Sequence, residues 1–195
     1  MRHSDKLDIT MIDIIIPARG IWVNVALVAG FAILTALCAQ LSFWIGPVPI
    51  TGQTFAVLIS GAILGSRCGA LAQLSYLLIG TTGLPFWFAA GGAPGIARLL
   101  SPTGGYLMGF VAAAYLTGWL CERGWGRRVW TSSLAMLCGS ACYYLFALPW
   151  LARFTGFESV LKIGLYPFIP GDLIKIGFAA MALPSAWHLL HTNEQ

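Results

Sequence analysis

Asp172 and Lys175 are the residues of this chain whose types and spacing best suit chemistry with a polar ligand. They follow Pro170 and Gly171, and a spacing of three residues places them on one face of a helix. They offer an acceptor and a donor side by side, which suits a small polar head with N–H groups and C=O or carboxylate groups. The alternative is a self-neutralising ion pair that fixes a helix start, with Asp172 favoured by the helix N-terminus.

A glycine-rich segment, residues 83–106, is the second candidate for ligand contact. Glycines let a backbone approach a ligand closely, and free N–H groups at a helix start can bind an anion. Aromatic residues within the segment would provide an apolar wall. The alternative is a loop that caps the bundle, with its aromatic residues at the membrane interface. The segment contains Phe86, Trp87, Phe88, Gly91, Gly92, Ala93, Gly104, Gly105 and Tyr106.

Gln53 lies in an uncharged break with two prolines, residues 47–54. We expect this break either to fold back over an outer cavity, with Gln53 facing the ligand, or to form a plain hairpin turn. The other reactive residue types form no recognisable site. The cysteines form no CxxC pair, the histidines lie near the chain ends, and GxSxG, HExxH and P-loop motifs are absent. We therefore predict no catalytic residue, no metal site, no cofactor and no enzyme activity.

The composition identifies the class of protein that positions these residues. Of 195 residues, 58% are hydrophobic and only 9% are charged, with a mean hydropathy of +0.79. Soluble domains carry about a quarter charged residues. A net charge of +4 without clustered basic residues excludes a typical nucleic-acid-binding domain. The sequence therefore predicts an integral membrane protein, multi-pass and located in the cell membrane.

The uncharged stretches predict one all-α domain with six spanning helices, since helices satisfy their own backbone in lipid. The leader is expected over residues 1–20, the bundle over 21–191 and a tail over 192–195. The leader could form a short surface helix or be loosely ordered. The six spans are expected at about residues 21–44, 54–65, 68–79, 104–121, 129–151 and 171–190.

The basic residues of the loops predict the orientation, because cytoplasmic loops are enriched in Lys and Arg. With both termini in the cytoplasm, the inner side has clearly more basic residues than the outer side. The inner residues are Arg2, Lys6, Arg19, Arg67, Arg123, Arg127 and Arg128, and the outer residues are Arg98, Arg153 and Lys162.

Small residues in the first span indicate a close helix contact, because small-xxx-small faces let membrane helices approach. They include Ala26, Gly30, Ala32 and Ala36. These residues are expected either to pack inside the same bundle or to form a docking face for another membrane subunit.

Several strings, in this order and spacing, resemble the BioY family, the biotin-binding S components of energy-coupling-factor (ECF) vitamin transporters. The resemblance covers residues 22–191 and implies a six-helix bundle with a vitamin site near the outer surface. The strings are GPVPITGQ ending at Gln53, GLP ending at Pro85, Gly91-Gly92, PTGGY ending at Tyr106, and FIPGD ending at Asp172, followed by Lys175.

The substrate implied by the resemblance is biotin, a fused ureido-thiophane ring with a carboxylate tail. Asp172 would accept from a ureido N–H, and Lys175 would donate to a biotin oxygen, either the ureido carbonyl or the tail carboxylate. The other residues expected at the ligand are Gly91, Gly92, Ala93, Gly105 and Tyr106, with Phe86 and Trp87 as walls for the apolar ring.

The chain departs from the family pattern in a few places. Ala93 stands where some members carry Asn, so a backbone group or Gln53 is expected to replace that hydrogen bond. Pro94 and Ser101 stand where glycines are usual. Arg98 is unusual here and would either attract the carboxylate or mark the headgroup level.

The mechanism implied by the resemblance is uptake. The S component would bind biotin outside, dock on a transmembrane coupling protein through the first span, and topple as two partner ATPases turn over. The predicted docking face is the set Ala26, Gly30, Ala32 and Ala36. The alternatives are an S component for another vitamin and an ion-coupled secondary carrier, although secondary carriers often contain inverted repeats and this chain shows no repeat.

Overall fold

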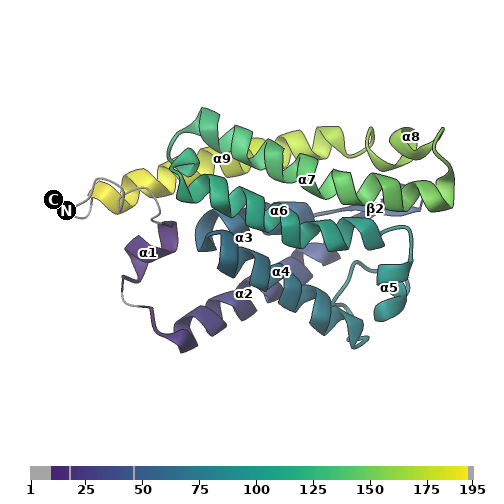
Figure 1. Ribbon diagram of the computed structural model, residues 1–195, viewed down its shortest axis with the longest axis horizontal. Helices are drawn as coiled ribbons and strands as arrows, with labels where there is room; N and C mark the ends of the chain where they lie inside the picture. The colour runs from purple at the N-terminus through teal and green to yellow at the C-terminus, as the bar shows by residue number, and fades with distance from the viewer. Residues whose placement is uncertain (1–9, 18, 46, 193–195) are drawn as a thin grey trace.

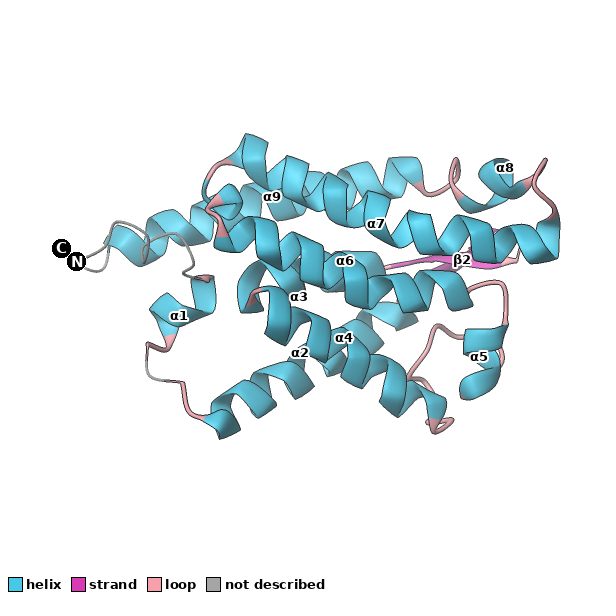
Figure 2. Cartoon of the chain, viewed as in Figure 1, coloured by secondary structure: helices cyan, strands magenta, loops and turns pink. Residues whose placement is uncertain are grey.

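The computed structural model describes residues 10–17, 19–45 and 47–192. These residues are mostly helical, with one short pair of strands (Figures 1 and 2). In chain order the elements are α1 (Met11–Ile15), α2 (Ile21–Gln40), β1 (Ser42–Ile45), β2 (Val48–Thr51), α3 (Gln53–Leu64), α4 (Ser66–Thr81), α5 (Ile96–Leu100), α6 (Gly104–Glu122), η1 (Trp125–Arg127), α7 (Val129–Thr155), α8 (Val160–Gly164) and α9 (Ile169–Thr192).

The long helices of the described chain, α2, α3, α4, α6, α7 and α9, each overlap one predicted span. Among the described residues, α2, α6 and α7 are long and apolar enough to cross a membrane, and α3 is a shorter apolar helix. The prediction of a mostly helical chain is confirmed. The last helix begins at Ile169, two residues earlier than predicted, because Pro170 suits the first turn of a helix, where its missing N–H costs nothing.

A β-hairpin replaces the end of the first predicted span. α2 ends at Gln40, and β1 pairs with β2 in antiparallel fashion, with Trp44 opposite Pro49. Proline fixes φ and lacks the N–H that a helix interior needs, so Pro47 and Pro49 favour extended backbone here. The all-α expectation is therefore corrected by one two-stranded sheet. Gly46, part of the string that carried the resemblance, lies outside the described residues.

α6 and α7 make the most extensive helix contact of the described chain. A Cβ built on Gly109 would lie 2.8 Å from Cα of Tyr143, and one on Gly105 would lie 3.0 Å from Cα of Ala147. Glycines four residues apart thus let the two backbones approach without intervening side chains. This contact carries Tyr143 to the centre of the main hydrophobic core, where it is almost fully buried.

The turn between α3 and α4 consists of Gly65, whose φ of +86° lies in the left-handed region that favours glycine. A Cβ there would lie 2.5 Å from Oε1 of Glu122. That oxygen accepts a hydrogen bond of 2.6 Å from the backbone N–H of Ser66, one of the free donors at the start of α4. The turn therefore ties α3 and α4 to the end of α6.

The two ends of the bundle differ in what they carry (Figure 1). α1 and the C-terminal part of α9 lie at one end, whereas α5 and α8 lie at the other. Met11 and Ile12 of α1 are buried against the bundle. The described part of the expected leader thus contains a short packed helix, and residues 1–9, 18 and 193–195 lie outside the description.

Candidate functional site

Asp172 lies in the first turn of α9 and is 7% exposed. Its Oδ2 atom accepts hydrogen bonds of 2.6 Å from the hydroxyls of Tyr143 and Tyr144, both on α7. Its Oδ1 atom lies 3.3 Å from Nζ of Lys175 and 3.4 Å from Oγ1 of Thr54. One carboxylate oxygen is thus firmly held, while the other has only long contacts and keeps capacity to accept from a ligand.

Lys175 joins α9 to the β-hairpin and to α3. Its ammonium donates to the backbone carbonyl of Thr51 at 2.8 Å and to Oγ1 of Thr54 at 2.9 Å. With the contact to Asp172, all three ammonium donors have partners. The sequence predicted that Asp172 and Lys175 share a helix face, and the structure confirms this. It also shows that the hairpin contributes a hydrogen-bond acceptor, the carbonyl of Thr51, to Lys175.

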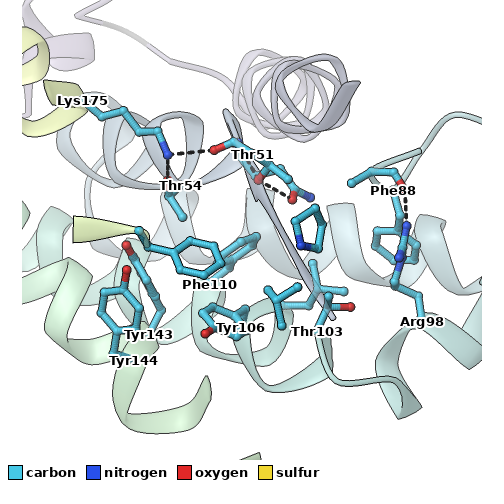
Figure 3. A pocket seen from close by; sticks show the side chains of 16 residues that line it. Thr51, Thr54, Phe88, Arg98, Thr103, Tyr106, Phe110, Tyr143, Tyr144 and Lys175 are labelled. Atoms are coloured by element: carbon cyan, nitrogen blue, oxygen red, sulfur yellow. Dashed lines mark hydrogen bonds between the residues drawn. The ribbon is translucent and has the colours of Figure 1, made fainter. Parts of the chain in front are cut away.

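Lys175 lines a pocket between the hairpin and the helices, as do Tyr143 and Tyr144 (Figure 3). Asp172 does not line it but is bonded to these three wall residues. Aromatic and aliphatic side chains predominate, with a few hydroxyls, one amide and two cationic groups among them. Such a mixture is typical of small-molecule sites, where few polar groups orient a ligand in an apolar cavity. The lining residues are Val48, Pro49, Thr51, Gln53, Thr54, Phe88, Ala89, Arg98, Thr103, Tyr106, Leu107, Phe110, Tyr143, Tyr144, Phe168 and Lys175.

Gln53 and Tyr106, both predicted at the ligand, line this pocket, and both side chains also have protein partners. The Gln53 amide donates to the Tyr76 hydroxyl and accepts from the Thr51 hydroxyl at 2.8 Å. The Tyr106 hydroxyl donates to the backbone carbonyl of Gly164 at 2.5 Å. These bonds fix the two side chains, so they contribute a shaped wall more than free hydrogen-bonding groups.

The glycine-rich segment lies beside the pocket. Gly91, Gly92, Ala93 and Phe86 line a second cavity, which adjoins the first because both include Phe88, Ala89 and Arg98 in their walls. Phe86 is 81% exposed and does not form a wall for a buried ring.

Two further predicted residues have packing contacts in the structure. The Trp87 indole donates to the backbone carbonyl of Tyr76 at 2.7 Å, and the two rings stack. Gly105 contacts α7 and does not line the pocket. Its position is explained by helix packing, which the sequence interpretation did not consider for it.

The four small residues of α2 do not form one face. Ala26 and Gly30 are exposed, and a Cβ on Gly30 would meet nothing within 4 Å. Ala32 is fully buried and Ala36 nearly so, both within the main core of this chain. The expectation of a single docking face is therefore corrected: Ala32 and Ala36 pack inside the bundle, and the exposed part of the face is at Ala26 and Gly30.

Sequence reasoning missed Tyr143, Tyr144, Phe110 and Thr54. The two tyrosines offered a signal, because adjacent phenols within an otherwise apolar span need hydrogen-bond partners. Their partner, Asp172, was itself a candidate acceptor expected at the start of a span. Phe110 offered none, since an aromatic residue in a spanning helix equally well faces lipid.

A family model described as "BioY family" matches residues 10–192 of the chain. The chain belongs to the BioY family. A relative from Pyrococcus horikoshii, named a probable biotin transporter BioY, is 41% identical over 81% of this chain and 92% of its own length. The biotin transporter BioY of Rhizobium etli is 38% identical over 80% of this chain and 87% of its own length.

A solved structure shares the fold of this BioY-family chain. It is the S-component for biotin from an ECF-type ABC transporter, with a TM-score of 0.70 and 23% identity, covering 88% of this chain and 91% of that one. The family resemblance expected from the motifs is confirmed, and the match begins earlier than expected, at residue 10. With its apolar helices, the chain is a membrane-embedded multi-pass protein.

Proposed function

We propose that this chain binds biotin in the pocket beside α9 and takes part in biotin uptake as the S component of an ECF transporter. The names of its relatives and the fold of its structural neighbour support this function. The observation that carries it is Lys175 in the wall of a largely aromatic pocket, paired with Asp172, which also holds the wall residues Tyr143 and Tyr144.

The chemistry of biotin fits this pair. Its ureido group has N–H donors and a carbonyl acceptor on one small ring. Oδ1 of Asp172, whose contacts with Thr54 and Lys175 are long at 3.4 and 3.3 Å, would accept from such an N–H. Lys175 would donate to the ureido carbonyl from the neighbouring position, in exchange for its long 3.3 Å contact with Asp172. The rings of Phe110 and Tyr144 then cover the apolar thiophane part.

The proposal extends to membrane topology and partners. All six long helices span the membrane, both termini lie in the cytoplasm, and the pocket opens to the outside. Arg123, Arg127 and Arg128 follow α6 at the end proposed to be cytoplasmic, as the distribution of basic residues in membrane proteins favours. A transmembrane coupling protein with two ATPase subunits docks at α2 through Ala26 and Gly30.

The test is calorimetric titration of the detergent-purified chain with biotin. Asp172→Asn and Lys175→Ala should each weaken binding about tenfold or more, because a charged hydrogen bond contributes roughly 1.5–3 kcal/mol. Glu158→Gln and Lys162→Ala are the matched controls, since both residues are exposed and outside the pocket. Wild-type affinity in both site variants would remove the site assignment. Saturable binding of a different vitamin, without biotin binding, would replace the substrate.

A further inference from the structure

Arg98 is a buried arginine at the side of the pocket away from Lys175 (Figure 3). It lies on α5, is 3% exposed, and forms part of the wall of both adjoining cavities. Its Nη2 atom donates to the backbone carbonyl of Ala89, and its Cζ atom lies 5.9 Å from the ring centre of Trp44.

This guanidinium has no counter-ion among the residues that the structure describes. The two ion pairs found there are Arg19 with Asp13 and Lys175 with Asp172. The remaining N–H groups of Arg98 have no hydrogen-bond partner in the described chain, although a guanidinium has five donors. A buried charge without a partner is costly, so a buried cation that faces a cavity indicates a place for an anion.

The glycine-rich segment holds this cation against the pocket. A Cβ on Gly92 would overlap the Arg98 guanidinium, so the guanidinium could not keep this position if residue 92 had a side chain. Burial lowers the pKa of Arg98, as expected for a cation removed from water. The backbone at Gly92 therefore packs directly against the guanidinium, which also lines the main pocket.

We propose that Arg98 binds the carboxylate of the ligand and so orients biotin, with its ureido ring at Asp172 and Lys175 and its tail toward Arg98. The assignment rests on the proposed function. Lys175 is the other cation of the pocket, but its charge is paired with Asp172, and it donates at 2.8 and 2.9 Å to Thr51 and Thr54. The carboxylate of Asp172 would also repel a second carboxylate there. Of the two cations that line the pocket, Arg98 is the one with unused donors and no acidic neighbour among the described residues.

The apolar middle of the pocket suits the same orientation. Val48, Leu107 and Phe110 line the same pocket as Arg98 and Lys175. A ligand with a polar ring, an aliphatic chain and an anionic end would thus place each part against a group of matching chemistry.

The experiment compares biotin with biotin amide, in which the tail carboxylate is replaced by a neutral group. In the wild type, biotin should bind about 10- to 100-fold more tightly than the amide, because a bidentate Arg–carboxylate bond adds a charged interaction. Arg98→Gln should weaken the binding of biotin by about the same 10- to 100-fold and leave the affinity for the amide unchanged. Arg98→Lys should retain part of the preference. Arg153→Gln is the matched control, an exposed arginine whose Cζ lies 5.1 Å from the ring centre of Trp150.

The outcomes separate this inference from the proposed function. Equal wild-type affinity for biotin and its amide would overturn the role of Arg98 while leaving biotin as the ligand. This comparison uses the wild-type protein alone, so it does not depend on whether a variant folds. An equal loss of both ligands in Arg98→Gln would show a structural role and would also overturn it. No binding of either compound by the folded wild type would instead overturn the proposed function.

Discussion

At the scale of single residues, the carboxylate of Asp172 is held by its neighbours before it can meet a ligand. Tyr143 and Tyr144 are consecutive on α7, yet both hydroxyls reach the same oxygen, Oδ2. Two donors on one oxygen fix the rotation of the carboxylate and keep its charge stabilised inside the bundle. The other oxygen is thereby directed toward Lys175 and Thr54.

The tyrosines can be tested as positioning residues. Tyr143→Phe and Tyr144→Phe should each weaken biotin binding by up to about tenfold, because each removes one charged hydrogen bond that orients Asp172. Tyr115→Phe, an exposed tyrosine on α6, should change nothing. The measurement is a titration with biotin, in which the double variant should lose more affinity than either single one. Unchanged affinity in the double variant would contradict the positioning role.

The site was predictable where charge made a residue conspicuous. Asp172 and Lys175 stand out in a chain that is only 9% charged. Lys175 lines the pocket, and Asp172 is bonded to three residues of its wall. Gly105 was assigned to the ligand through the resemblance of its Gly-Gly-Tyr string to the family motif, but sequence cannot tell a glycine that a ligand needs from one that a neighbouring helix needs. Phe86 was assigned as a wall of the site, yet its side chain is exposed. The hydrophobic character of a residue alone does not predict whether its side chain points into a pocket or away from it.

At the scale of elements, α6 and α7 depend on glycine at their contact. Gly109→Ala should lower the midpoint of thermal unfolding in detergent, because the new Cβ would lie 2.8 Å from Cα of Tyr143. Overpacking of this kind costs about 1–3 kcal/mol. Gly30→Ala is the matched control, since a Cβ there meets nothing within 4 Å. It should leave the midpoint unchanged or raise it, because alanine favours a helix over glycine. Equal shifts in both variants would contradict the packing argument.

The two faces of α2 predict opposite results for bulky substitutions. Ala32→Trp should reduce the yield of folded protein, because Ala32 is fully buried in the core. Gly30→Trp should preserve biotin binding and stability but prevent co-purification with the coupling protein, because Gly30 is exposed. The assays are gel filtration, biotin titration and co-purification with an ECF module. Normal co-purification of Gly30→Trp would remove this docking face.

The elements were predictable as apolar stretches, but their ends were not. Residues 41–45 are almost as apolar as α2, so hydropathy extended the first span through them. The decisive information was the pair of prolines that follows, which favours extended backbone and allows a hairpin. α1 was left open between helix and loose leader because Met11 and Ile12 are buried only through contacts with distant parts of the chain.

At the scale of the whole molecule, the proposed topology places α8 outside and η1 inside. In a variant whose native cysteines are replaced by alanine, Lys162→Cys should react with a membrane-impermeant maleimide added to intact cells. Arg127→Cys should react only after the membrane is opened. Both positions are exposed, so accessibility of the side chain itself does not limit either reaction. The reverse labelling pattern would invert the orientation, and labelling of both sites from outside would contradict six spans.

Charge balance in the pocket has a consequence for transport across an energised membrane. Among the described residues, the charged groups that line the pocket are Lys175 and Arg98, and Asp172 is paired with Lys175, so the three sum to one positive charge. A bound carboxylate would reduce this sum to zero. Moving one elementary charge through a membrane potential changes the free energy by about 2.3 kcal/mol per 100 mV. The occupied pocket would therefore cross the membrane field without electrical work, and the inward step would be insensitive to voltage.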